Sequence, residues 1–294
     1  MAKWTAADIP AQSGRTVVVT GANSGLGAAT ARELARAGAH VIIACRNVSK
    51  GEAAAATMAG TVEVRPLDLA DLSSIRSFAS TLSDPFDVLI NNAGVMALPL
   101  RRTADGFEMQ IGTNHLGHFA LTGLLLDRIR DKVVTVSSGV HRLGRIRLDD
   151  LNWESGRYQR WLAYAQSKLA NLLFTYELSR RLTAAGSPVK SLAAHPGYAA
   201  TNLQSHTESI QDKVMSLGNR LAQSAEMGAL PTLYAATMDV PTATYLGPDG
   251  FMENRGHPKV VRSNAASHNE EVARRLWELS EHLTDVIYKL TPQT

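Results

Sequence analysis

The amino-acid sequence predicts a single doubly wound α/β domain, with a parallel sheet of about seven strands and helices on both faces. Two observations lead to this fold class. Short runs rich in Val, Ile and Leu alternate with longer amphipathic stretches, and a glycine-rich turn joins the first run to the first helix. Neither an internal repeat nor a break in composition divides the 294 residues, so we treat 1–294 as one domain.

The candidate strands are short and strongly apolar, as is typical of strands buried on both faces. They cover residues 15–20, 39–45, 61–66, 86–91, 132–138, 189–195 and 242–246. Between them lie helical stretches such as "AATARELARAGA", "DLSSIRSFASTL", "ALTGLLLDRI" and "YAQSKLANLLFTYELSRRL", and "NEEVARRLWELSEHLTDVIY" predicts a last amphipathic helix. The polar segment 203–227 follows a strand's carboxyl end, where open α/β sheets bind ligands, so we expect a substrate lid there.

Composition narrows the class of protein. Hydrophobic residues make up 45% and charged residues 19%, as in ordinary globular enzymes. The net charge is +3 and the basic residues are scattered, so we expect no nucleic-acid partner. Cys45 is the only cysteine, no apolar run reaches the ~18 residues of a membrane span, and the N-terminal stretch lacks a signal peptide's apolar core. These features predict a cytoplasmic protein without an integral membrane segment.

The first strand runs directly into "TGANSGLG" at residues 20–27, and a helix follows. Glycines in such a turn allow a tight bend and close backbone approach, and the helix N-terminus offers free N–H groups to a pyrophosphate. This pattern predicts a Rossmann-type dinucleotide site. Its expected cofactor contacts in the turn are Gly21, Asn23, Ser24, Gly25, Leu26 and Gly27.

The end of the second strand indicates which dinucleotide binds. A site for NAD carries an acid there against the ribose 2′-hydroxyl, whereas this strand ends on Cys45 and Arg46. A guanidinium suits a 2′-phosphate, so we predict NADP. After the third strand, Asp68 could accept a hydrogen bond from the adenine amine, and Leu69 is expected beside it.

The stretch "AYAQSK" at 163–168 puts Tyr164 and Lys168 four residues apart, on one face of a helix. A cation near a phenol favours the phenolate, so the pair could act as a general acid/base. Alone, the spacing occurs by chance in many helices, where the tyrosine packs and the lysine is solvated.

Further motifs resemble the short-chain dehydrogenase/reductase family. In family order, the chain has T-G-x-x-x-G-x-G at 20–27, Asp68, N-N-A-G at 91–94, Asn114, Ser138, Tyr164 with Lys168, and P-G at 196–197 followed by Thr201. They span residues 20 to 201, about two thirds of the chain. "ACRN", "NHLGHF", "VSSGVHR" and "YLGPDGF" are similar to the branch that includes retinol dehydrogenases and protochlorophyllide reductase, which generally uses NADP.

The resemblance implies a role for each matching residue. Tyr164 would be the general acid in carbonyl reduction and the base in alcohol oxidation. Lys168 would hold the nicotinamide ribose and depress the pKa of Tyr164, while Ser138 would hydrogen-bond the substrate oxygen and Asn114 would support Lys168 through a water. The remaining expected cofactor contacts are Asn92, Ala93, Gly94, Pro196, Gly197, Ala199 and Thr201. The interval between Ser138 and Tyr164 is longer than usual, so the sequence alone does not fix whether these side chains face each other.

The leading hypothesis is therefore an NADP-dependent oxidoreductase acting on a small, apolar carbonyl or alcohol. One alternative is a sugar-nucleotide epimerase or dehydratase, which the glycine spacing disfavours. Another is a non-catalytic cofactor-sensing protein, although such proteins typically lose a catalytic residue. His115 and His118 make an incomplete metal site, so we predict no metal. The family often pairs through the helices that contain Asn114 and Tyr164, so a homo-oligomer is one expectation.

Overall fold

The structure is a computed structural model that describes residues 3–198 and 223–290. Its described strands form one sheet in the order β3-β2-β1-β4-β5-β6-β7-β8, parallel except for the antiparallel β7–β8 pair. Their bounds are β1 Thr16–Thr20, β2 His40–Cys45, β3 Thr61–Pro66, β4 Phe86–Asn91, β5 Ile129–Val136, β6 Lys190–Ala194, β7 Tyr245–Pro248 and β8 Pro258–Val260. The predicted doubly wound parallel sheet is confirmed.

The sheet has one strand more than predicted, and several strand ends are displaced by one to three residues, as at the start of β5. The short strand β8 was missed because it has only three residues, begins with a proline and lies largely exposed at the sheet edge. Strand β5 begins at Ile129, not at Lys132, since Ile129 pairs with Phe86 before a register shift toward Val88. Because Arg130 and Asp131 are polar, the apolar pattern of the sequence does not reveal the first residues of β5.

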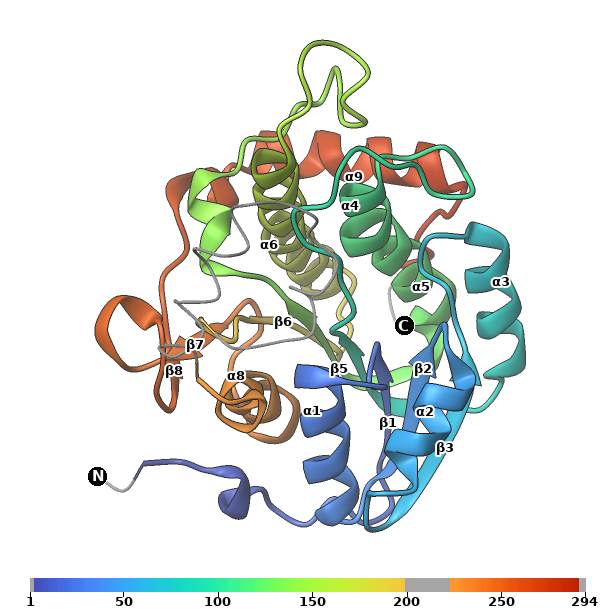
Figure 1. Cartoon of the computed structure of the whole chain (residues 1–294), viewed down its shortest axis with the longest axis vertical. Helices are drawn as coiled ribbons and strands as arrows, with labels where there is room; N and C mark the ends of the chain where they lie inside the picture. Colours follow the sequence, from blue (N-terminus) through green and yellow to red (C-terminus); the bar gives the residue numbers. More distant parts are fainter. Residues whose placement is uncertain (1–2, 199–222, 291–294) are drawn as a thin grey trace.

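Helices cover both faces of the sheet, each over its own buried cluster of apolar side chains (Figure 1). On one face lie α1 Gly25–Arg36, α2 Val48–Ala55 and α8 Ala225–Thr237. On the other lie α3 Leu72–Thr81, α5 Gly117–Leu125, α6 Arg160–Ala184 and, outermost, α9 Glu270–Thr284. Trp277 of α9 packs against Phe119 and Phe174, so part of the outward surface of α5 and α6 is covered by the chain's own last helix.

The predicted lid lies mostly outside the described residues, and so do Ala199 and Thr201. Its final residues are described, and they differ from the prediction. The Ser224 hydroxyl caps α8 by accepting from the Met227 N–H, so residues 225–227 begin a regular helix. The following "ALPTLYAAT" is almost uniformly apolar because both sides of α8 are buried, which conceals helical periodicity.

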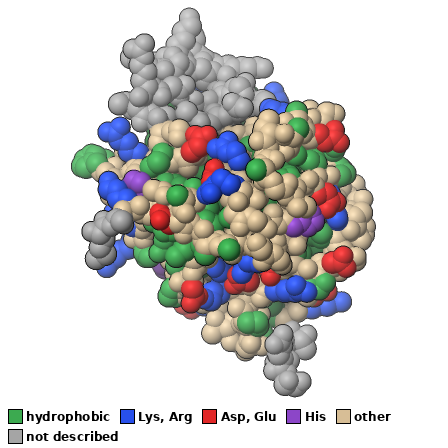
Figure 2. Space-filling model, turned by 90° about the horizontal axis from the view of Figure 1, so that it is seen from below, with side chains coloured by type: hydrophobic (Ala, Val, Ile, Leu, Met, Phe, Trp, Pro, Cys, Tyr) green, Lys and Arg blue, Asp and Glu red, His purple; other side chains and the backbone are tan. Residues whose placement is uncertain are grey.

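Surface features of the described residues add two observations. On the face shown in Figure 2, basic and acidic side chains are interspersed with apolar ones. Across residues 3–198 and 223–290, every helix is too short or too polar to cross a bilayer.

Candidate active site

The glycine-rich turn after β1 is shaped by close backbone contacts. Gly21 and Gly25 have φ of +66° and +56°, which favour glycine over other residues. A Cβ on Gly21 would lie 2.8 Å from the Ala93 Cβ, and one on Gly27 would lie 2.5 Å from Asn92 Nδ2. The turn therefore seats α1 directly against the N-N-A-G segment.

The N-terminus of α1 suits a phosphate. Ser24 is its N-cap residue but makes no side-chain capping hydrogen bond, so the first N–H groups of the helix, at Gly25, Leu26 and Gly27, have no protein cap. The half-buried Asn23 precedes them in the turn. Uncapped N–H groups at a helix N-terminus fit a dinucleotide pyrophosphate, so these residues are suited to hold one.

Thr20 fastens the turn to the end of β4. Its hydroxyl oxygen accepts from the N–H groups of Asn92 (2.9 Å) and Ala93 (3.0 Å), and Asn92 Nδ2 donates to the Thr20 carbonyl at 2.8 Å. These bonds explain why the polar residue Asn92 directly follows the buried strand β4. Because the Asn92 side chain and the N–H groups of Asn92 and Ala93 are used internally, the carbonyl groups of these two residues are what remains for a cofactor.

Arg46 stands at the carboxyl end of β2, beside the glycine-rich turn. Its side chain is exposed and makes no hydrogen bond or ion pair with the described residues, whereas the neighbouring Asn47 caps α2 by accepting from the Lys50 N–H. A free guanidinium at this position fits a ribose 2′-phosphate.

Asp68 and Leu69 follow β3. One carboxylate oxygen of Asp68 accepts from the Ala70 N–H at 2.9 Å, and this bond shapes the turn. Leu69 is buried, and its carbonyl oxygen would lie 2.4 Å from a Cβ on Gly117. Leu69 therefore contributes backbone packing on α5, and only the remaining Asp68 oxygen is available to an adenine amine.

Asn114 lies in a π-helical turn, η2 Gly112–Leu116, between the short α4 Met109–Ile111 and α5. Its amide group spans two segments: Oδ1 accepts from the Val95 N–H at 2.8 Å, while Nδ2 donates to the Val95 carbonyl and to Ser167 Oγ, both at 2.9 Å. Because Ser167 lies between Tyr164 and Lys168 on α6, Asn114 connects the N-N-A-G loop to the helix of the predicted acid/base pair. Irregular helical turns of this kind are frequent at functional sites.

Tyr164 and Lys168 both lie on the buried length of α6. Lys168 Nζ donates to the Val136 carbonyl at 3.1 Å and lies 5.8 Å from the Tyr164 ring centroid. A Cβ on Gly94 would be 3.5 Å from this Nζ and 3.1 Å from Asn114 Oδ1, so the absence of a side chain at Gly94 keeps space open beside both groups.

The two serines at the end of β5 have different surroundings. Ser137 is buried, and its hydroxyl donates to the Lys168 carbonyl at 2.8 Å, a structural bond to α6. Ser138 is half-buried and begins the short helix η4 Gly139–Leu143, where its Oγ accepts weakly from Val140. A hydrogen bond from Ser138 lowers the pKa of Tyr164, so the two side chains do face each other across the long interval.

Burial controls the protonation of the pair. It raises the pKa of Tyr164 to about 12, against the lowering effect of Ser138, and it lowers the pKa of Lys168 to about 8. Burial is the larger of the two effects on the Tyr164 pKa, so the net shift is upward, opposite to the lowering expected from the sequence. In the chain itself, then, Tyr164 is a protonated donor at neutral pH and Lys168 is a cation.

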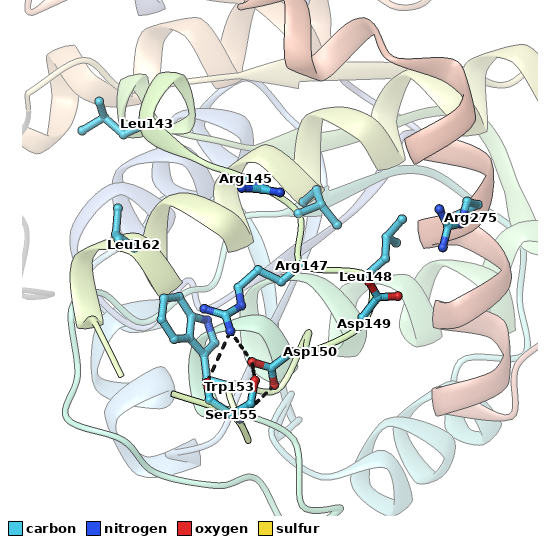
Figure 3. A pocket seen from close by; sticks show the side chains of 11 residues that line it. Leu143, Arg145, Arg147, Leu148, Asp149, Asp150, Trp153, Ser155, Leu162 and Arg275 are labelled. Atoms are coloured by element: carbon cyan, nitrogen blue, oxygen red, sulfur yellow. Dashed lines mark hydrogen bonds and ion pairs between the residues drawn. The ribbon is translucent and has the colours of Figure 1, made fainter. Parts of the chain in front are cut away.

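Two of the three aromatic residues in the interval between Ser138 and Tyr164 pack against each other. Trp153 is buried, 5.6 Å from Tyr158 between ring centroids, and Arg147 covers its ring at 4.4 Å while bonding Asp150 (Figure 3). Trp161 instead lies in the first turn of α6, 6.3 Å from the Tyr164 ring. The interval also lines an open cavity of about 590 Å³ with Leu162 and Arg275, and none of the four predicted catalytic residues contributes to it.

His115 and His118 have protein partners for their ring nitrogens. His118 Nδ1 faces the Asn114 carbonyl at 3.0 Å and its Nε2 faces Thr20 Oγ1 at 2.9 Å, while His115 Nε2 contacts Ser280 Oγ at 3.0 Å. Burial lowers the pKa of His115 to about 3 and that of His118 to about 4. Within residues 3–198 and 223–290, no three His, Cys, Asp or Glu side chains gather as a metal site. His118 thus joins the glycine-rich turn to Asn114, a connection that the sequence did not reveal.

The P-G turn follows β6, the neighbour of β5 in the sheet. Gly197 has φ of +66°, and a Cβ there would lie 2.4 Å from the Asn254 carbonyl oxygen, so the turn packs tightly on the loop after β7. Pro196 accepts a hydrogen bond from Gln223 Nε2 through its carbonyl. The contacts of this turn with residues near position 254 were also missed, because they join segments more than fifty positions apart.

Comparisons with known proteins agree with this fold. The short chain dehydrogenase family profile matches residues 15–212, so the chain belongs to the short-chain dehydrogenase/reductase family. Over 290 residues it is 46% identical to human retinol dehydrogenase 13, covering 92% of this chain and 84% of that protein. It is 44% identical to human retinol dehydrogenase 11, with 91% and 85% covered. The chain is thus an oxidoreductase of the retinol dehydrogenase-like branch.

Two solved structures are also similar. A protein from Mycobacterium paratuberculosis has 58% identity and a TM-score of 0.87, with 98% of this chain and all of that chain covered. An NAD(P)-dependent gluconate 5-dehydrogenase from Beutenbergia cavernae, solved with bound NADP, has 28% identity and a TM-score of 0.59, with 76% and 90% covered.

Proposed function

We propose that the protein is an NADP-dependent oxidoreductase that transfers hydride between the nicotinamide and a carbonyl or alcohol substrate, with Tyr164 as general acid/base. The observation that carries this proposal is the meeting of Tyr164, Lys168, Ser138 and Asn114 at the sheet edge that also bears the uncapped glycine-rich turn. Family membership supports the same reaction class.

The bound cofactor would supply the hydride, and the chain's residues would manage the proton and the developing charge. Tyr164 is protonated at neutral pH, with its pKa raised by burial to about 12, which is the form that a general acid needs for carbonyl reduction. Ser138, half-buried beside the phenol, would donate to the same substrate oxygen and stabilise its negative charge.

Lys168 and Asn114 would orient the reacting groups. The Lys168 ammonium spends one donor on Val136, so its other two remain for the ribose hydroxyls. Its pKa, lowered by burial to about 8, still leaves it charged at pH 7. Asn114 fixes α6 against the N-N-A-G loop through Ser167 and Val95, and this keeps the ammonium in register with Gly94.

The preference for NADP rests on Arg46. Losing a charge-assisted hydrogen bond costs on the order of 1.5–3 kcal/mol, a tenfold or larger effect on binding. We therefore expect NADPH to bind more than tenfold tighter than NADH, and Arg46→Asp to reverse that preference. Titration of both variants with both cofactors, followed by tryptophan fluorescence, tests this; equal affinities in the unmodified protein would contradict it.

The substrate class is proposed from the relatives. Human retinol dehydrogenases 13 and 11 are named for retinol, an apolar primary alcohol, so a retinoid aldehyde belongs in a first panel beside simple aldehydes and ketones. Net oxidation of NADPH with a panel member supports an oxidoreductase. Turnover without net NADPH consumption would favour an epimerase, and tight NADPH binding without any turnover would favour a cofactor sensor.

A further inference from the structure

The loop between β7 and β8, residues 249–257, is joined to the P-G turn by one direct backbone bond and by bonds through Gln223. Tyr198 N–H donates to the Asn254 carbonyl at 2.7 Å, and Gly256 N–H donates to Gln223 Oε1 at 3.1 Å. Gln223 in turn bonds Pro196 and donates its N–H to the Tyr198 carbonyl at 2.9 Å. The loop therefore packs against the turn at 196–198, which is expected to hold the nicotinamide.

Glu253 occupies an unusual position in this loop. Its φ is +58° and that of Met252 is +50°, two adjacent left-handed residues without glycine. Such conformations are costly and persist where surrounding contacts enforce them. Burial of apolar side chains does not supply the enforcement, because Phe251 and Met252 are 86% and 76% exposed.

The contacts of Glu253 join both sides of the site. One carboxylate oxygen, Oε2, lies 3.3 Å from His195 Nε2 and 3.3 Å from an Arg142 guanidinium nitrogen. His195 is the last residue before the P-G turn, and Arg142 belongs to η4, the short helix that Ser138 begins. A single carboxylate thus contacts a neighbour of the nicotinamide turn and a neighbour of the predicted catalytic serine.

His195 transmits this contact to the turn itself. Its Nδ1 accepts from the Gly197 N–H at 3.3 Å, so Nδ1 carries no proton and Nε2 is the protonated nitrogen of the neutral ring. Nε2 is buried and makes no hydrogen bond with the described residues, and Glu253 Oε2, 3.3 Å away, is the carboxylate oxygen that faces it. The space for the ring comes from Gly247 on β7, where a Cβ would lie 2.0 Å from His195 Nε2.

The Arg142 side is anchored as well. The Arg142 guanidinium also donates to the Arg262 carbonyl at 3.0 Å, and the adjacent His141 is buried with Nδ1 2.7 Å from the Ser138 carbonyl. Residues 141 and 142 of η4 are therefore held by contacts with Ser138, Arg262 and Glu253.

We propose that Glu253 is a positioning residue that holds the turn at 196–198, through His195, and the Ser138-bearing η4 helix, through Arg142, in a fixed relation to each other. This inference rests on the proposed function for its kinetic consequence, although the contacts themselves do not. Glu253 touches neither substrate nor cofactor in this account. It acts by keeping the serine hydroxyl and the nicotinamide face at a productive separation.

The test compares Glu253→Ala, Glu253→Gln and the matched control Glu278→Ala, which removes an exposed carboxylate paired with Arg274 on the outside of α9. The first readout is hydrogen exchange of peptides covering 194–198 and 139–143, measured without substrate. We expect faster exchange in both peptides for Glu253→Ala, near-normal exchange for Glu253→Gln because its amide oxygen still accepts from His195, and no change for Glu278→Ala.

The second readout is turnover of a carbonyl that the unmodified protein reduces, alongside an NADPH titration. Glu253→Ala should lower kcat by about tenfold or more, as expected for small misplacement of reacting groups. NADPH affinity should fall less than kcat, because the glycine-rich turn and Arg46, which Glu253 does not contact, stay in place. Glu253→Gln should restore most of kcat. Unchanged exchange and unchanged kcat in Glu253→Ala would overturn the proposal. If the unmodified protein reduces no carbonyl, the proposed function fails, while the exchange comparison still decides whether Glu253 holds the two segments. Should Glu253→Ala fail to fold, Arg142→Met tests the η4 arm alone.

Discussion

Acidification should destabilise this protein through histidines buried in neutral form. Burial lowers the pKa of His115 to about 3, and that of His118 and His141 to about 4, from 6.5 in each case. The folded state therefore binds fewer protons than the unfolded state between pH 6.5 and about 4. Stability from these groups is fully present above pH 6.5 and is lost as the pH falls toward the folded pKa values.

The magnitude follows from the same shifts. At pH 5 the unfolded chain gains about 2 kcal/mol for each histidine that protonates only on unfolding, or about 6 kcal/mol for three. This sum is comparable with the whole free energy of unfolding of a typical domain, about 5–15 kcal/mol. We expect urea unfolding, followed by tryptophan fluorescence at pH 7.5, 6 and 5, to show a steep loss of stability.

His115→Phe isolates one of these groups. The ring packs against both Phe119 and Phe174, and Ser280 keeps its own bond to the Leu276 carbonyl, so we expect a phenyl ring to be tolerated. The variant should lose about 2 kcal/mol less than the unmodified protein between pH 7.5 and pH 5. His282→Gln, which removes an exposed imidazole from α9, is the control and should leave the pH dependence unchanged. A stability of the unmodified protein at pH 5 within about 1 kcal/mol of that at pH 7.5 would show that these histidines do not stay neutral in the folded state.

Two further predictions concern the site's construction. Lys168→Met should raise the free energy of unfolding at pH 7 by about 2–3 kcal/mol, because burial lowers the pKa of Lys168 from the ordinary 10.5 to about 8 in the folded protein. This gain should shrink as the pH rises from 8 toward 10.5. Urea unfolding at pH 7 and pH 10 measures it, and a lower stability of the variant at pH 7 would contradict the prediction. Gly27→Ala should lower the free energy of unfolding by about 1–3 kcal/mol and abolish NADPH binding, because the added Cβ would lie 2.5 Å from Asn92 Nδ2. Gly139→Ala is the control, since a Cβ there has no neighbour within 4 Å. Thermal unfolding and an NADPH titration compare the two variants.

The sequence predicted the sheet well because buried parallel strands leave a clear signal of short apolar runs between helices. The seven predicted strands all exist, with boundaries displaced by a few residues. Helix α8 was missed because a helix buried on both sides loses the polar face that periodicity detects. Strand β8 forms through its hydrogen bonds with β7, and its three residues do not show the apolar pattern of a buried strand.

The candidate site was predictable where a motif is local and unpredictable where contacts cross the chain. Tyr164 and Lys168 are joined by helix spacing, and the glycines of residues 20–27 by one turn. The bond from Asn114 to Ser167 and the contact of Glu253 with His195 join segments 53 and 58 positions apart, and no spacing rule links them. The pKa of Tyr164 also needed the structure, since spacing suggests a nearby cation but says nothing about burial.

The most direct test of the central claim is turnover by Tyr164→Phe, which keeps the ring and removes only the hydroxyl. With a carbonyl that the unmodified protein reduces, we expect kcat to fall by about 10²–10⁴-fold, the usual contribution of positioned proton transfer, while NADPH affinity changes little. Tyr176→Phe, on the same helix and bonded to Ser263, controls for loss of a phenol elsewhere in α6 and should keep its activity. Near-normal turnover by Tyr164→Phe would contradict the account, because the phenol would then pack the helix without donating the proton.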